Sequence, residues 1–256
     1  MKKILYVVSL FFSIGWSSCN YLDVVPKNDV RSIETIFERK SSVETWLKGA
    51  YVMFSDHISS IMIDPAFCGA DEVVGGDYIR QRYTSQNRFQ AYGFLIGDGL
   101  QNVQNPYGDV WKNDEFYAIL RYCNIFFENI HRTYNLTPEE KRLWTGEMEA
   151  LKAHVYFELL RRYGPFILVP ENLPANSDME VMQQPRAPID SCVSAIVRLC
   201  DDAMDKLPPL AEKGNLRKAF HAKEAAATIK AMALLYAASP LFNPNRSLGF
   251  PSVVWQ

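Results

Sequence analysis

Hydrophobic residues recur three and four positions apart over most of the chain, and this spacing predicts five long helices. The first is expected to begin at Ser41, because Ser41 and Glu44 form a capping-box pattern in front of an apolar stripe. The second is expected to begin near Trp111 and to bury one face. That face consists of Phe116, Leu120, Cys123, Phe127 and Ile130.

The third predicted helix has the clearest boundaries in the chain. Thr137 can cap its first turn, Pro138 fits the first helical position, and Glu140 completes a capping box. The helix is expected to run to Tyr163 and to end at Gly164, which a proline follows. Its apolar residues occupy two faces, so it should be sandwiched between neighbouring helices.

Two further helices complete the pattern, one after Pro188 and one from about Ala222 to Ala238. Ala153, Phe157 and Pro165 fit the second helix of a tetratricopeptide (TPR) repeat, whereas the first-helix signature of that repeat is not found ahead of them. The sequence therefore predicts an all-α fold of TPR-like helical hairpins and not a regular repeat array.

Residues 64–108 break the pattern. They are rich in Gly, Asp, Asn, Arg and Tyr and show no sustained periodicity. An irregular insertion of this length in a compact domain is uncommon and is often functional. We therefore expect a ligand site of this protein to involve this loop.

The N-terminus has the layout of a secretion signal. Lys2 and Lys3 precede an apolar run from Ile4 to Ile14, and small residues precede Cys19. The run is shorter than the roughly 20 residues that span a bilayer. Residues 1–18 are therefore predicted to be a lipoprotein signal peptide with Cys19 as the lipid attachment site; an ordinary cleaved signal is the alternative. Residues 19–40 are expected to be extended, and residues 41–256 to form the helical domain.

Charge excludes two classes of partner. The formal net charge is −2, and removal of Lys2 and Lys3 with the signal gives −2 − 2 = −4. A mildly acidic chain without a cluster of Lys and Arg has no basic surface that could bind nucleic acid or anionic lipid headgroups.

Motifs of catalysis and metal binding are not found. No nucleophile elbow, phosphate loop or metalloprotease motif occurs. His154 and Glu158 have metal-ligand spacing, but two ligands alone fit a hydrogen bond or a core histidine better. Asp71 and Glu72 are adjacent, so they cannot flank a sugar ring as the carboxylates of a glycosidase do. The sequence predicts a non-enzyme without a cofactor.

The cysteines do not indicate a disulfide framework. Cys192 and Cys200 would lie about 12 Å apart along one helix, whereas a disulfide needs Cα atoms within about 7 Å. Cys123 fits an apolar stripe as a small buried residue.

Aromatic and charged residues gather in the irregular loop. Aromatic rings can stack on the apolar face of a pyranose, while Arg and Asp can bind its hydroxyls. The candidate glycan-binding residues are Asp71, Tyr78, Arg80, Arg82, Tyr83, Arg88 and Tyr92. The alternative for each ring is that it packs the loop onto the helices.

Five segments resemble the SusD/RagB family, in the order that this family has them. They are Cys19–Pro26, Gly69–Glu72, Trp111–Ile130, Gly146–Pro170 and Lys230–Asn243. The fourth is similar to the most recognisable stretch of the family, with Met148 and Lys152 as conservative departures and with a proline missing from the segment 166–169.

The resemblance implies a TPR-like fold without catalysis and with a variable binding loop after Asp71-Glu72. It also implies capture of glycans at the outer membrane, for delivery to a SusC-type TonB-dependent transporter. Family members continue beyond the last segment, so the C-terminal half is expected to be missing here. The alternative function is a lipid-anchored, TPR-like adaptor for proteins or peptides, and a glycoside hydrolase is a more distant third.

Overall fold

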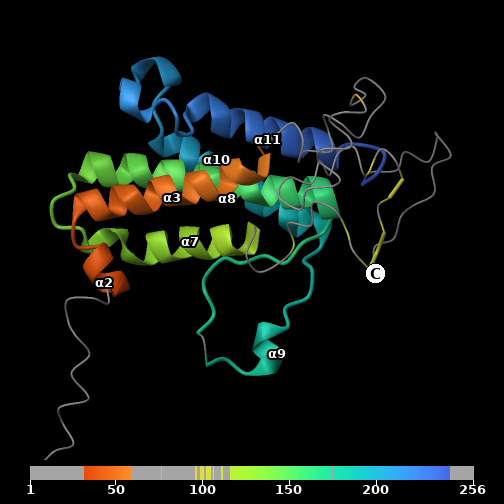
Figure 1. Cartoon of the computed structure of the whole chain (residues 1–256). Coiled ribbons are helices and arrows are strands. Elements are labelled where there is room, and N and C mark those ends of the chain that lie inside the picture. Colours follow the sequence, from red (N-terminus) through yellow and green to blue (C-terminus); the bar gives the residue numbers. More distant parts are fainter. Residues whose placement is uncertain are drawn as a thin grey trace, which may run out of the picture.

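The computed structural model describes residues 32–58 (without the side chains of 55–58), 116–174 and 176–242, together with residues 76, 96, 99, 100, 102–104, 106 and 111. Every regular element in this part of the chain is helical, which confirms the all-α prediction (Figure 1). The elements are α2 (Ile33–Ile36), α3 (Lys40–Ile58), α7 (Phe116–Asn129), η1 (Ile130–Arg132), α8 (Pro138–Tyr163), α9 (Met179–Met182), α10 (Ile189–Lys206), η2 (Leu210–Glu212), η3 (Asn215–Arg217) and α11 (Lys223–Ala237).

The long helices alternate in direction. Along α3 and α7, Phe54 contacts Phe116 and Trp46 contacts Tyr122, so these two helices are antiparallel. The same relation holds between α7 and α8, between α8 and α10, and between α10 and α11 (Figure 1). The result is a stack of helical hairpins, as the sequence predicts.

Helix α8 forms the centre of the stack and packs against α3, α7, α10 and α11. Fourteen of its residues are buried, and they lie on several sides of the helix. This confirms the prediction of a sandwiched helix. Such a helix has no exposed face along its middle turns, so its charged residues also become part of the interior.

The ends of α8 follow from local chemistry. The Thr137 hydroxyl accepts from the Glu140 N–H at 3.2 Å, and the Glu140 carboxylate accepts from the Thr137 N–H at 3.2 Å. At the other end Gly164 has a φ of 69°, a conformation that glycine adopts without strain. Both boundaries agree with the prediction.

The start of α3 differs from the prediction. The helix begins at Lys40, so the expected capping box of Ser41 and Glu44 is not formed. The Lys40 N–H instead donates to Asn135 Oδ1 at 2.7 Å, and Glu44 pairs with Lys48 at 3.0 Å. A side chain from a distant part of the chain therefore caps this helix.

Two other boundaries are corrected. Residues 33–36, which lie in the segment expected to be extended, form the short helix α2, and the Ser32 hydroxyl caps it by accepting from the Thr35 N–H at 3.4 Å. Trp111 is not helical, and α7 begins at Phe116. On α7 the ring of Phe126 is fully buried, whereas Phe127 is only half-buried.

One end of the stack collects the long connections. Helices α3 and α8 end there, α7 and α10 begin there, and residues 59–115 and 164–188 connect them. In Figure 1 the second connection, which carries α9, extends well away from the long helices. No helix in the described part of the chain has the length and apolar character needed to cross a bilayer.

Candidate functional site

The residues that the sequence singled out for function lie outside the described residues. They are Cys19, Asp71, Tyr78, Arg80, Arg82, Tyr83, Arg88 and Tyr92. Their roles stay predictions. Open cavities in the described part of the chain include one beside Trp111, one beside Trp46 and one beside Lys152.

The first cavity lies at the end of the stack with the long connections and has a volume of about 450 Å³. Trp111, which follows the irregular loop in sequence, forms part of its wall. The Trp111 ring lies 5.2 Å from Tyr117 and 5.1 Å from Tyr163, and the Arg186 guanidinium lies 4.5 Å above it. These three contacts hold the indole in one position.

This Trp111 cavity combines apolar walls with few polar groups. Leu168, Leu173 and Met182 supply apolar surface, and Glu171 and Gln184 supply hydrogen-bonding groups. The Tyr117 hydroxyl is engaged, because it accepts from the Ile167 N–H at 3.2 Å. Burial raises the pKa of Tyr117 to about 12, so the phenol stays neutral. The lining suits a small ligand with one apolar face and several hydroxyls.

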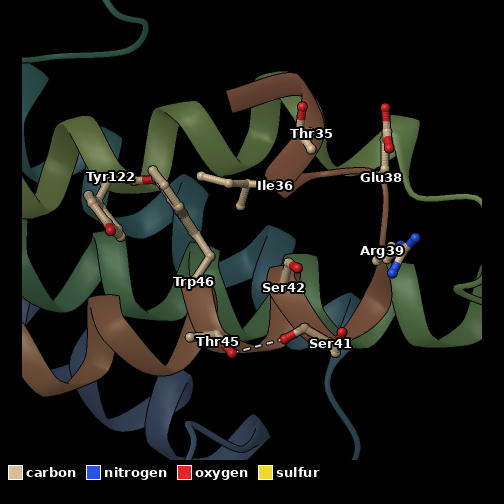
Figure 2. A pocket seen from close by; sticks show the side chains of 9 residues that line it. All are labelled: Thr35, Ile36, Glu38, Arg39, Ser41, Ser42, Thr45, Trp46 and Tyr122. Atoms are coloured by element: carbon tan, nitrogen blue, oxygen red, sulfur yellow. Dashed lines mark hydrogen bonds between the residues drawn. The ribbon is translucent and has the colours of Figure 1, made fainter. Parts of the chain in front are cut away.

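The second cavity, of about 650 Å³, lies among α2, the first turns of α3 and the middle of α7 (Figure 2). Trp46 stacks on Tyr122 with ring centroids 3.8 Å apart and planes at 9°, and its Nε1–H donates to the Tyr122 carbonyl at 3.1 Å. Figure 2 shows Ile36 on the side of Trp46 that faces away from Tyr122. One face of the indole is therefore covered by Tyr122, and this pair joins α3 to α7.

The third cavity, of about 470 Å³, is a groove over α8 with α7 and α10 as its walls. Lys152 lines it with only 4% of its surface exposed. Its ammonium donates to Asn124 Oδ1 and to the Pro170 carbonyl, which is 3.2 Å away. Burial lowers the pKa of Lys152 to about 8. Sequence reasoning treated this residue only as a conservative substitution.

A buried ionic cluster lies on the other side of α8. Glu147 is fully buried and pairs with Lys213 at 2.9 Å and with Arg217. Lys213 also donates to the carbonyls of Phe220 and His221, at 3.1 and 2.7 Å. These contacts tie the connection between α10 and α11 to the central helix, so we assign the cluster a structural role.

Hydrogen bonds also link Tyr51, His221 and His154. The Tyr51 hydroxyl lies 2.8 Å from His221 Nδ1, and His221 Nε2 lies 3.1 Å from His154 Nδ1. Glu158 instead pairs with Arg161 and Arg162. His154 and Glu158 therefore serve different partners, and no group of three metal-binding side chains comes together within the described ranges.

Comparisons with known proteins identify the family. A family model described as "Starch-binding associating with outer membrane" matches residues 20–234. No protein with a curated description matches the chain.

Solved structures of similar fold support the same assignment. A SusD-like protein from Bacteroides fragilis is 27% identical, with a TM-score of 0.63 over 79% of this chain and 36% of its own. A SusD homolog from Bacteroides thetaiotaomicron is 19% identical, with a TM-score of 0.62 over 83% of this chain and 39% of its own. A laminarin-binding SusD-like protein is 15% identical, with a TM-score of 0.61 over 81% of this chain and 44% of its own.

The chain thus spans well under half the length of these solved relatives. The last two likenesses show the fold, and the family model covers nearly all of the helical domain. The chain belongs to the SusD-like family of starch-binding proteins associated with the outer membrane.

Proposed function

We propose that this protein is a non-catalytic glycan-binding lipoprotein of the cell surface. It captures oligosaccharides or polysaccharides and passes them to a TonB-dependent transporter, and lipid on Cys19 holds it at the outer membrane. The observation that carries this proposal is the match of the family model to residues 20–234.

The glycan site is proposed at the end of the stack where the long connections meet. The insertion that contains Tyr78 and Tyr83 begins after Ile58, and Trp111 near its end lines the 450 Å³ cavity. An indole fixed by three neighbours, apolar side chains and two polar groups is the kind of lining that can position a sugar ring. The loop aromatics would then extend this surface.

Calorimetry tests the proposal with the chain lacking residues 1–19 and a panel of glycans that includes malto-oligosaccharides and laminarin. We expect binding to one glycan class. Removal of a stacking ring in Tyr78→Ala or Tyr83→Ala should weaken binding by about tenfold, which corresponds to about 1.4 kcal/mol.

Tyr134→Ala is the matched control. Tyr134 is 72% exposed and lies in the connection between η1 and α8, at the opposite end of the stack. This variant should bind as the unchanged protein does. Binding of peptides in place of glycans would favour the adaptor function, and release of shortened sugars during the titration would contradict a non-catalytic protein.

A further inference from the structure

The groove over α8 differs from the other two cavities because a buried cation lines it. Helices α7 and α10 both pack on α8, and their facing residues leave α8 as the floor. Phe127 forms one wall, and Arg198, Leu199 and Asp202 form the other. Leu168 and Pro170 close one end, and both also line the neighbouring Trp111 cavity. The segment 168–170 therefore separates the groove from the proposed glycan site and borders both.

Lys152 lacks a carboxylate partner within this groove. Its hydrogen-bond acceptors among the described residues, Asn124 Oδ1 and the Pro170 carbonyl, are neutral, and the centroids of the Phe127 and Tyr156 rings each lie 5.8 Å from its ammonium. Among the described residues no carboxylate forms an ion pair with Lys152. A buried cation gains strongly from an anion that reaches it, because the interior screens charge less than water does.

The other charged residues of the groove do not form ion pairs with Lys152 within the described part of the chain. Glu149, one turn before Lys152, is occupied by Lys206, whose ammonium lies 2.9 Å from both of its carboxylate oxygens. Arg198 is exposed on the wall and, within the described part of the chain, is in no ion pair. Two cations thus face the groove, while one of its two carboxylates is already bound.

We propose that this groove binds the carboxylate of an acidic sugar, such as a uronic acid residue of a glycan. Lys152 and Arg198 hold the carboxylate, Asp202 accepts from sugar hydroxyls, and Phe127 and Leu199 contact the apolar face of the ring. This inference rests on the proposed glycan-binding function and specifies that the bound glycan contains acidic sugars.

Titration calorimetry at pH 7 compares trigalacturonate with the neutral trisaccharide maltotriose. We expect trigalacturonate to bind, and we expect Lys152→Met to weaken that binding by about tenfold or more. Lys152→Arg keeps the charge and should retain affinity within about threefold. Arg198→Ala changes an exposed side chain and is expected to leave the fold unchanged, and it should weaken binding about threefold to tenfold.

Lys230→Met is the control for the loss of a lysine, because Lys230 pairs with Asp201 outside the groove, at 2.6 Å. It should leave the affinity for trigalacturonate unchanged. Circular dichroism establishes that each variant is folded before its affinity is measured.

Raising the pH from 7 to 9.5 provides a second readout. The charged or titratable groups around Lys152 are Cys123 and Glu128 on α7, Glu149 and Tyr156 on α8, and Arg198 and Asp202 on α10. Burial raises the pKa of Cys123 to about 12 and raises that of Tyr156 as well, so both stay neutral in this window. Lys152 loses its proton there, and the affinity for trigalacturonate should fall.

Four results would overturn the inference. Equal binding of trigalacturonate by the unchanged protein, Lys152→Met and Arg198→Ala would show that the groove is not the binding site. Binding of neutral glycans without any binding of trigalacturonate would show that the ligand is not an acidic sugar, and it would leave the proposed glycan-binding function intact. Tight binding of a tri-glutamate peptide, lost in the same variants, would replace the sugar by an acidic peptide. Failure of every sugar to bind would remove both proposals together.

Discussion

At the scale of single residues, the interior of this protein depends on charges that neutralise one another. The Glu147 side chain is fully buried and that of Lys213 is 1% exposed, so neither can be solvated. Arg217 completes the cluster, and its guanidinium also lies 4.2 Å above the Phe220 ring. Removing Glu147 leaves Lys213 buried without a counter-charge among the described residues, which is far costlier than losing an ion pair in water.

Glu147→Gln should therefore destabilise the protein by about 3–5 kcal/mol, because Lys213 loses its only ion-pair partner among the described residues. Urea unfolding followed by circular dichroism measures this difference. Glu44→Gln removes a carboxylate 3.8 Å from the same Arg217 at a side chain that is 35% exposed, and it should change stability by less than about 1 kcal/mol. Equal effects of the two substitutions would contradict a role for burial.

The two half-buried histidines, His154 and His221, predict a loss of stability in mild acid. Burial lowers the pKa of His221 to about 3 and also lowers that of His154. In the unfolded chain a histidine has a pKa of about 6.5. Between these values the unfolded chain binds a proton that the folded protein excludes, so the stability present above pH 6.5 is lost as the pH falls.

From pH 7 to pH 5 the free energy of unfolding should decrease by about 2 kcal/mol for His221 alone. Urea midpoints measured across this range test the effect. His221→Gln should flatten the dependence, whereas His131→Gln, at an exposed residue of η1, should leave it as it is. A pH dependence that is the same in all three proteins would place its origin elsewhere.

At the scale of elements, the contact between α8 and the end of α10 is set by a single glycine. A Cβ atom at Gly146 would lie 2.8 Å from Lys206 Cβ and 3.1 Å from Leu207 Cγ, so a side chain cannot fit without moving α10. Gly146→Ala should cost about 1–3 kcal/mol in thermal or urea unfolding.

Gly49 provides the opposite case within α3. A Cβ there would have Tyr122 as its nearest neighbour, at 3.9 Å, which is an ordinary contact. Gly49→Ala should therefore stabilise the protein by about 0.5–1 kcal/mol through the helix preference of alanine. A destabilised Gly49→Ala would show that the spacing between α3 and α7 is tighter than these distances indicate.

Helix boundaries could be predicted from the sequence where the residues that fix them lie next to the boundary. The ends of α8 were predictable because Thr137, Glu140 and Gly164 act within one turn of the boundary. The start of α3 was not, because Asn135, which caps Lys40, is distant in sequence. Trp111 was assigned to a helix because apolar spacing alone does not distinguish a helical turn from a residue packed just before it.

The described cavities were harder to anticipate than the helices. Lys152 lies in the middle of a helix, where a charged residue normally indicates an exposed face, yet α7 and α10 cover it. Its burial depends on contacts between separate helices, and no local pattern records them. The loop residues from Asp71 to Tyr92 lie outside the described ranges, so that part of the predicted site is still to be tested.

At the scale of the whole molecule, the helices provide a frame with chemically different ends. The end with α2 and η1 carries the shorter connections, whereas the other end carries residues 59–115 and 164–188. A protein that recognises a ligand through loops benefits when its long loops all lie at one end of a rigid helical stack, because the helices then fix where each loop starts and stops. Both proposed sugar sites involve the loop-bearing end or the groove beside it.

The contact of Phe54 with Phe116 also bears on how new specificity can arise. Their ring centroids are 5.9 Å apart, so the chain leaves α3 and enters α7 at nearly the same place. An insertion between two such fixed points can change in length at little cost in stability, since doubling the length of a flexible loop adds only about 0.6 kcal/mol of closure free energy. If this insertion binds the ligand as proposed, related chains that differ in residues 59–115 are expected to bind different ligands on the same helical stack.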